Sequence, residues 1–180
     1  MVNARLAPVP QSQWPQPLQA VLENSSADGS GRENLFGTLA HHPQLAYAWL
    51  GLAKLLTHNG LLPARTRELV VLRTSHRHGS AFVWARHEQH AREKGLSQAE
   101  IAAISVPGTH PWSAEDQAVL TAVDELVDRA DLSDDSWHRL SALLDEPQII
   151  ELLMVVGQCV TVGMTLRTLR TPLQAKETSS

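Results

Sequence analysis

The stretch "RTRELVVLRTSHRHGSAFVWARHEQH", residues 65–90, decides the fold because it predicts two helices separated by a glycine. Pro63 suits the first turn of the first helix, which stops at Gly79. Ser80 occupies the N-cap position of the second helix, and Gly95 follows its end. Because a connection this short favours antiparallel neighbours, we expect faces of the two helices to meet.

Apolar residues recur at helical spacing upstream of this pair. The spacing predicts a helix that begins near Pro43 and ends before Asn59 and Gly60. Its apolar stripe consists of Leu45, Trp49, Leu52 and Leu56.

Serine residues mark three helix starts downstream. Ser97 and Glu100 have the spacing of a capping box, Ser113 opens a second S-x-x-D start, and a further helix is expected near Ser133. The last helix, from about residue 147 to residue 169, is apolar on nearly all sides. Such a helix belongs in the middle of the fold or at a subunit interface. The sequence therefore predicts an all-α bundle of six to eight helices.

Both ends of the chain differ in composition from its centre. Residues 1–30 are expected to form a Pro-rich arm, a short helix over residues 16–24 and a flexible connector. Residues 31–172 are expected to form a single domain, and residues 173–180 a mobile tail.

Composition limits the class of function. Of the 180 residues, 43% are hydrophobic and 19% are charged, and the formal net charge is −4. We expect no nucleic acid as a partner, because phosphate binding needs several Lys or Arg residues on one face. Cys159 is the only cysteine, so an intrachain disulfide and a two-thiol redox cycle within one chain are excluded. Without a signal-peptide core or a long apolar run, a cytoplasmic protein that does not use a membrane is expected.

Glu68 and His87 are the candidate reactive residues. At about 100° per residue, Glu68 shares a helix face with Ser75, and His87 shares one with Ser80 and Val83. Burial among apolar neighbours is expected to raise the pKa of the Glu68 carboxyl, which could then exchange protons with an imidazole near neutrality. In the alternative interpretation, Glu68 pairs with a nearby arginine and His87 is solvated.

The sequence from residue 62 to residue 104 resembles a known family. "LPARTRELVVLRTSHRHGSAFVWARHEQHAREKGLSQAEIAAI" is similar to the core of the carboxymuconolactone decarboxylase and alkylhydroperoxidase D-like (AhpD-like) proteins, and the resemblance is strongest over residues 34–128. In the peroxidase branch a Glu stands twelve residues before a C-x-x-C pair, and a His stands four residues after its second cysteine. Those positions hold Glu68, Ser80, Val83 and His87 here.

The missing thiols select between the activities that the resemblance implies. Peroxide reduction in the thiol branch needs one thiolate to attack and another to resolve, which Ser80 and Val83 cannot do. The resemblance then implies an AhpD-like helical bundle and a cofactor-independent lyase or decarboxylase. It would act on a small organic acid or lactone through proton transfer by Glu68 and His87. The alternative from another class is a non-catalytic protein that binds a small ligand or acts in assembly.

Further residues are candidates for the substrate pocket. We predict that it is lined by Ser80, Val83, Trp84, His42 and Gln158. Each has a structural alternative: an N-cap for Ser80, core packing for Trp84, a capping or surface role for His42, and a hydrogen-bonded core amide for Gln158.

We predict neither a metal nor a cofactor. "HEQH", residues 87–90, is one residue short of the H-E-x-x-H spacing that brings two metal ligands together. Cys159, among Val and Met, is expected to be buried packing. The expected partners are a small-molecule substrate and further copies of the chain, in a homotrimer or homohexamer.

Overall fold

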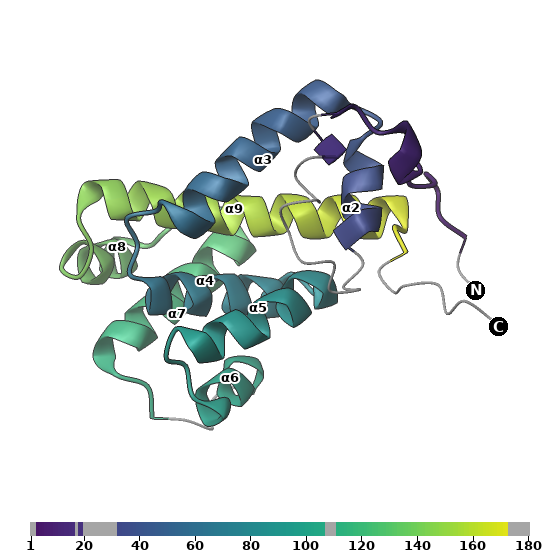
Figure 1. The fold of residues 1–180 in the computed structure, drawn as a ribbon. Coiled ribbons are helices and arrows are strands. Elements are labelled where there is room, and N and C mark those ends of the chain that lie inside the picture. The colour runs from purple at the N-terminus through teal and green to yellow at the C-terminus, as the bar shows by residue number, and fades with distance from the viewer. Residues whose placement is uncertain (1–2, 17, 20–31, 107–110, 173–180) are drawn as a thin grey trace. The chain divides into compact units, whose positions relative to one another are not determined.

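Helices make up all of the regular structure in the part of the chain that the computed structural model describes (Figure 1). That part comprises residues 3–16, 18–19, 32–106 and 111–172. Within it, eight α-helices follow a short 3-10 helix, η1 (Gln11–Gln13), which confirms the all-α prediction. The α-helices are α2 (Arg32–Leu39), α3 (Pro43–His58), α4 (Ala64–Arg77), α5 (Ala81–Glu93), α6 (Gln98–Ser105), α7 (Ala114–Arg129), α8 (Asp134–Ser141) and α9 (Glu146–Leu169).

The chain divides into two compact units. The first comprises residues 1–57 with 164–180, and the second comprises residues 58–163. The predicted tail, most of the predicted connector and most of the short helix predicted for residues 16–24 lie outside the described residues.

In the first unit, the N-terminal arm packs against α2 of its own chain. Trp14 is buried, and its ring meets Phe36 edge-on with 6.2 Å between centroids. A Cβ at position 37 would lie 2.8 Å from Cβ of Pro8 and from the carbonyl oxygen of Val9. Glycine at that position therefore lets the arm approach α2, and the Val9 amide donates a hydrogen bond to the Gly37 carbonyl at 3.0 Å.

The helix α3 forms over the predicted range, but its apolar stripe is only partly buried. Leu56 is buried and Trp49 packs against the core cluster of the first unit. Leu45 and Leu52 of the same stripe are exposed. Helical spacing identifies a shared face, but not which part of that face meets another element.

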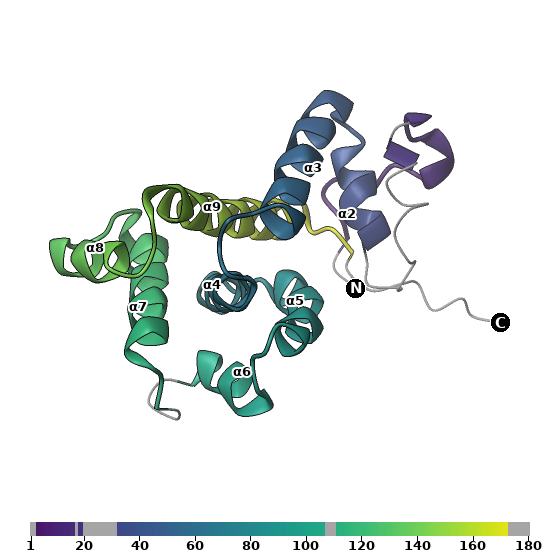
Figure 2. The same ribbon diagram turned by 60° about the vertical axis from the view of Figure 1, so that its left-hand side comes forward.

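The second unit is arranged around α4. Figure 2 looks nearly along α4 and shows α5, α6 and α7 around it, in agreement with the close contacts of α4 with each of these helices. The middle of α4 is apolar and fully enclosed, with Leu69, Val70 and Leu72 each 0% exposed. A helix buried on several sides places its few polar side chains in low-dielectric surroundings.

Serine caps form at three helices, and those at Ser97 and Ser113 were predicted. The hydroxyl of Ser97 accepts from the Glu100 amide while the Glu100 carboxylate accepts from the Ser97 amide, which completes the capping box of α6. Ser113 caps α7 and Ser133 caps α8 through hydrogen bonds from the third residue on. These caps depend only on local sequence.

The helix α9 is the longest of the described helices and is predominantly apolar. Its backbone extends over 24 residues, and by length and composition alone it could cross a membrane. Half of its most apolar window is buried within the protein, and the core helix of a soluble protein passes the same test. Glu151 of α9 accepts hydrogen bonds from the amides of Leu61 and Leu62, which fixes the chain entering α4.

Candidate functional site

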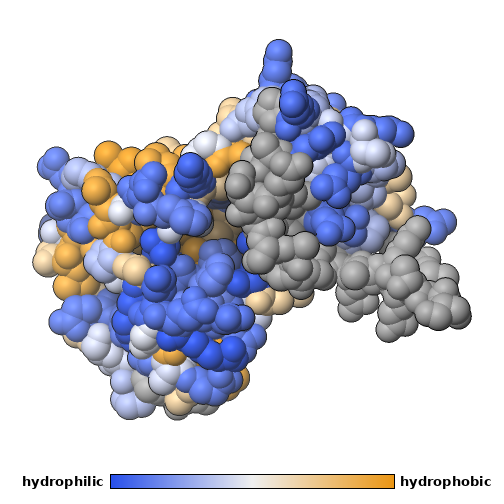
Figure 3. All heavy atoms as spheres, in the orientation of Figure 1, coloured by the Kyte–Doolittle hydropathy of each residue, from blue (hydrophilic) through white to orange (hydrophobic). Residues whose placement is uncertain are grey.

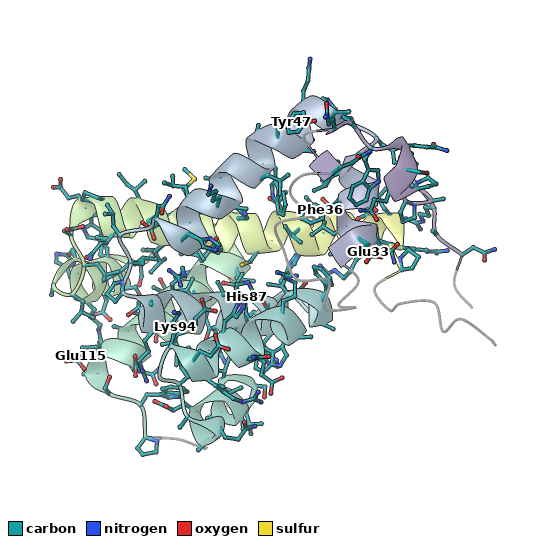
Figure 4. All side chains as sticks on the ribbon, viewed as in Figure 1. Glu33, Phe36, Tyr47, His87, Lys94 and Glu115 are labelled. Atoms are coloured by element: carbon teal, nitrogen blue, oxygen red, sulfur yellow. The ribbon has the colours of Figure 1, made fainter. Side chains whose placement is uncertain are left out.

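Glu68 on α4 and His87 on α5 lie in direct contact. Nδ1 of His87 is 2.8 Å from Oε2 of Glu68, and the side chain of Glu68 is 3% exposed while that of His87 is 17% exposed. In Figure 4, His87 is labelled on α5, where this helix faces α4. The turn formed by His78 and Gly79, which has a φ of 68°, brings the two helices side by side. Their catalytic role stays a prediction.

Arg67 contacts the other oxygen of the same carboxylate. Its Nη2 lies 3.3 Å and its Nε 3.4 Å from Oε1 of Glu68, and the Arg67 side chain is 10% exposed. The carboxylate therefore lies between an imidazole and a guanidinium. Arg67 is the arginine that pairs with Glu68, whereas Arg65 and Arg73 bind acidic residues of other helices.

The environment of Glu68 lowers the pKa of its carboxyl, contrary to the rise expected from burial. Burial is the largest influence and would raise this pKa. The hydrogen bond from His87, the charge of His87 and then the charge and hydrogen bond of Arg67 together outweigh it. Glu68 is therefore a carboxylate at neutral pH, and a proton donor in this pair has to be the imidazole.

An ionised Glu68 defines how His87 can act. A carboxylate only accepts hydrogen bonds, so Nδ1 of His87 is assigned the hydrogen atom and donates a hydrogen bond to Oε2 of Glu68. The other ring nitrogen, Nε2, is then left for a ligand, as acceptor when the ring is neutral and as donor when it is protonated. A buried carboxylate that accepts this hydrogen bond fixes the orientation and the tautomer of the imidazole.

His90 lies beside this pair on the exposed side. The rings of His87 and His90 meet edge-on with 5.7 Å between centroids. Glu68, His87 and His90 each offer one possible ligand atom, all within 4.8 Å of one another, so their types and spacing could hold a metal ion. Both oxygens of Glu68 are already engaged, and the adjacent charge of Arg67 opposes a bound cation. We therefore interpret the group as a proton-transfer pair.

Cys159 of α9 is buried and close enough to Glu68 to feel its charge. Burial, and secondarily the negative charge of Glu68, raises the pKa of this thiol to about 12. The thiol stays protonated at physiological pH and is a poor nucleophile. Burial of Cys159 agrees with the packing role expected from the sequence.

The predicted pocket residues of the second unit occupy different environments. Ser80 and Val83 are buried, and Trp84 is half-buried with its ring edge-on to His76 at 6.3 Å between centroids. Ser80 precedes α5 as predicted, but its side chain makes no capping hydrogen bond. A Cβ at Gly163 of α9 would lie 3.2 Å from Oγ of Ser80, so that hydroxyl faces α9.

The structural alternative fails for Gln158 and is observed for His42. Oε1 of Gln158 is buried without a hydrogen-bond partner among the described residues, so the interpretation as a satisfied core amide fails at this atom. His42 is exposed in the first unit, and its Nδ1 accepts a hydrogen bond from the Leu45 amide at 3.3 Å, which caps α3. Their roles toward a substrate stay predictions.

Comparison with known proteins identifies a family match within this chain. Residues 43–125 match the model of the carboxymuconolactone decarboxylase family, a range that contains both Glu68 and His87. A curated relative, uncharacterized protein YdfG of Bacillus subtilis (strain 168), is 29% identical over 101 residues. The matched region covers 52% of this chain and 65% of YdfG, so the chain spans under two thirds of the relative's length.

Solved structures with the same fold include AhpD-like proteins. A protein of unknown function from Agrobacterium tumefaciens, described as a candidate antioxidant defence protein AhpD, is 25% identical with a TM-score of 0.68. The match covers 77% of this chain and 96% of that one. An uncharacterized peroxidase-related protein with an AhpD core, from Ralstonia eutropha JMP134, has a TM-score of 0.79 at 16% identity, covering 98% and 95% of the two chains. These likenesses confirm the predicted AhpD-like fold.

Proposed function

Since this chain is carboxymuconolactone decarboxylase-like over residues 43–125 and AhpD-like in fold, we propose that it is a cofactor-independent lyase. It removes the carboxyl group of a small organic acid or lactone. The observation that carries this proposal is the 2.8 Å hydrogen bond between Glu68 and His87, two residues nineteen positions apart. A carboxylate that orients an imidazole is a common arrangement for moving a proton at neutral pH.

The proposed step replaces a carbon–carboxylate bond by a carbon–hydrogen bond. Cleavage releases CO2 and leaves the bonding electron pair on the substrate carbon, where a conjugated lactone carbonyl can delocalise it. Protonated His87 then donates the proton on Nε2 to that carbon, while Glu68 stabilises the imidazolium until transfer. A proton from solvent restores His87, so each turnover consumes one proton and releases one CO2.

A thiol-independent reaction fits the surroundings of the pair. Positions 80 and 83, which hold the cysteines of the peroxidase branch by the resemblance, are Ser80 and Val83. The thiol of Cys159, with its raised pKa, is not ionised at neutral pH. Proton transfer by Glu68 and His87 requires neither sulfur nor an added cofactor.

Assembly of several copies is part of the proposal. Figure 3 shows hydrophobic side chains gathered over α8 and the first half of α9. The exposed apolar residues of these two helices and the segment that joins them include Trp137, Leu143, Ile150, Leu153 and Met154. A patch of this kind favours burial against another protein surface. We propose a cytoplasmic homotrimer or homohexamer, which sedimentation equilibrium would test.

The function is tested with a panel of small carboxylated lactones and unsaturated organic acids, by following CO2 release. His87→Gln should lower kcat by about 100- to 10,000-fold, because a positioned acid or base contributes that much. His138→Gln is the matched control, since His138 is an exposed histidine of α8. Ligands that raise the melting temperature without being converted would favour a binding protein, and equal activity of the two variants would contradict the mechanism.

A further inference from the structure

The four arginines of α4 divide into two groups by their partners. Three of them make contacts of 2.5–2.7 Å with acidic side chains of α6 or α7. These pairs are Arg65 with Glu100 and Asp116, Arg73 with Asp124, and Arg77 with Asp128. They join α4 to its neighbours and leave these guanidinium groups neutralised.

Arg67 differs from the other three in position and in partner. Its recorded acceptor among the described residues is Oε1 of the adjacent Glu68, and both contacts, at 3.3 and 3.4 Å, are long for a charged pair. Only Nε and Nη2 make these contacts, although a guanidinium has five N–H donors. The other N–H groups of Arg67 have no acceptor among the described residues, and 10% of its side chain is exposed.

We propose that Arg67 is the binding site for the carboxylate of the substrate, next to the proton donor His87. This inference rests on the proposed function and deepens it, because it assigns the substrate class as a carboxylate anion. The fork of N–H groups on a guanidinium matches a carboxylate, and the long contact to Glu68 leaves that fork only partly used. The carboxyl group to be lost is thereby held within reach of the imidazole that replaces it with a proton.

Charge balance couples anion binding to a proton. Arg67 and ionised Glu68 carry opposite charges, so an entering carboxylate adds one negative charge to a poorly solvated site, and a proton taken up together with the ligand offsets it. That proton is the one that decarboxylation consumes. His90 is the further titratable neighbour on α5, and Cys159 of α9 stays a neutral thiol. The acidic residues that α6 and α7 direct at α4 are occupied by other arginines: Glu100, Asp116, Asp124 and Asp128.

A stable ligand pair tests the inference without turnover. The saturated lactone acid 5-oxotetrahydrofuran-3-carboxylate carries the anion, and its methyl ester is the neutral twin. Titration calorimetry should give tighter binding of the acid to the wild type, with uptake of up to one proton per ligand near pH 7.5 in buffers of different ionisation enthalpy. Arg67→Gln should weaken binding of the acid about ten- to a hundredfold, which corresponds to the loss of a charged hydrogen bond. Arg67→Lys should bind the acid with an affinity between those of the wild type and Arg67→Gln, because lysine keeps the charge without the fork of N–H groups.

The controls separate this inference from the proposed function. Arg77→Gln, the same substitution on the same helix, should bind the acid like the wild type. Equal affinity of the wild type for acid and ester, no binding of either, or unchanged affinity in Arg67→Gln would overturn the carboxylate site. Those results would leave a measured decarboxylase activity standing. Conversely, Arg67-dependent binding of the acid in a protein that converts no carboxylic acid would retain the site and refute the lyase. The comparison of acid and ester binding by the wild type still tests the carboxylate site if both Arg67 variants fail to fold.

Discussion

Glu68→Gln should destabilise the folded protein because it removes one charge of a buried pair. Oε1 of Glu68 lies 3.3 Å from Nη2 of Arg67, with side-chain exposures of 3% and 10%. Removing one partner of a buried pair costs about 3–5 kcal/mol, since the other charge stays buried alone. Here the contact is long, and the glutamine oxygen can still accept a hydrogen bond from His87. We therefore expect a loss of about 2–3 kcal/mol, which corresponds to a melting temperature lower by roughly 5–10 °C.

Urea unfolding followed by circular dichroism measures this loss, and Glu88→Gln provides the control. Glu88 pairs with Arg92 one helical turn away on the more exposed side of α5, so its substitution should cost about 0.5 kcal/mol or less. A second comparison combines Glu68→Gln with Arg67→Met. The double variant should be more stable than the sum of the two single losses predicts, because no lone charge remains. If Glu68→Gln lowers the free energy of unfolding no more than Glu88→Gln does, the energetic coupling of Glu68 with Arg67 is refuted.

The pH dependence of the same difference has a definite sign. Burial would raise the pKa of Glu68, but the contacts with His87 and Arg67 lower it below its ordinary value of 4.5. A carboxyl whose pKa is lower in the folded than in the unfolded chain contributes its full stability above the unfolded pKa. That contribution is lost as pH falls through the folded pKa. The advantage of wild type over Glu68→Gln should therefore be present at pH 7 and decline below about pH 4.5; an advantage that grows on acidification would contradict the lowered pKa.

Three further outcomes are expected. Leu72→Ala should lower the free energy of unfolding in urea by about 2–5 kcal/mol, because Leu72 is 0% exposed and its truncation leaves a cavity between α4 and its neighbours. A loss under about 1 kcal/mol would contradict the burial of Leu72. Iodoacetamide should not label Cys159 in the native protein at pH 8, since burial raises the pKa of its thiol to about 12, and mass spectrometry would detect any adduct. Zn²⁺ should change the melting temperature of wild type and His90→Ala equally; a shift that needs His90 would instead identify a metal site.

Local signals in the sequence predicted most of the helical framework. The caps at Ser97, Ser113 and Ser133 need only a hydroxyl and an amide three residues later, so the pattern contains the whole interaction. The contact of Glu68 with His87 was expected from two helical faces and a short turn, and its distance of 2.8 Å agrees with that reasoning. Both inferences depend on geometry that follows from the helix repeat alone.

Interactions that depend on the surroundings were beyond the sequence. Ser80 has the residue type and position of a cap, yet its side chain faces α9 and makes no capping bond. The pKa of Glu68 was expected to rise because apolar neighbours are visible in the sequence. The opposing contacts of His87 and Arg67 become visible only in three dimensions. An arginine next to a glutamate in the sequence gives no signal that its other N–H donors have no acidic partner among the described residues, as is the case for Arg67.

The residue at position 67 contributes to the state of the pair formed by Glu68 and His87. With an apolar residue at position 67, burial would oppose ionisation of Glu68, and one positive charge that favours the carboxylate would be missing. A protonated Glu68 carboxyl would no longer orient the imidazole by accepting its hydrogen bond. A fully neutralised arginine, like Arg73 with its two 2.7 Å contacts to Asp124, would leave no donors for a substrate. A weakly paired arginine meets both requirements, since it helps to keep Glu68 ionised and still offers donors to an anion. In the proposed site, the long contact between Arg67 and Glu68 therefore leaves donors for a substrate carboxylate while Glu68 orients His87.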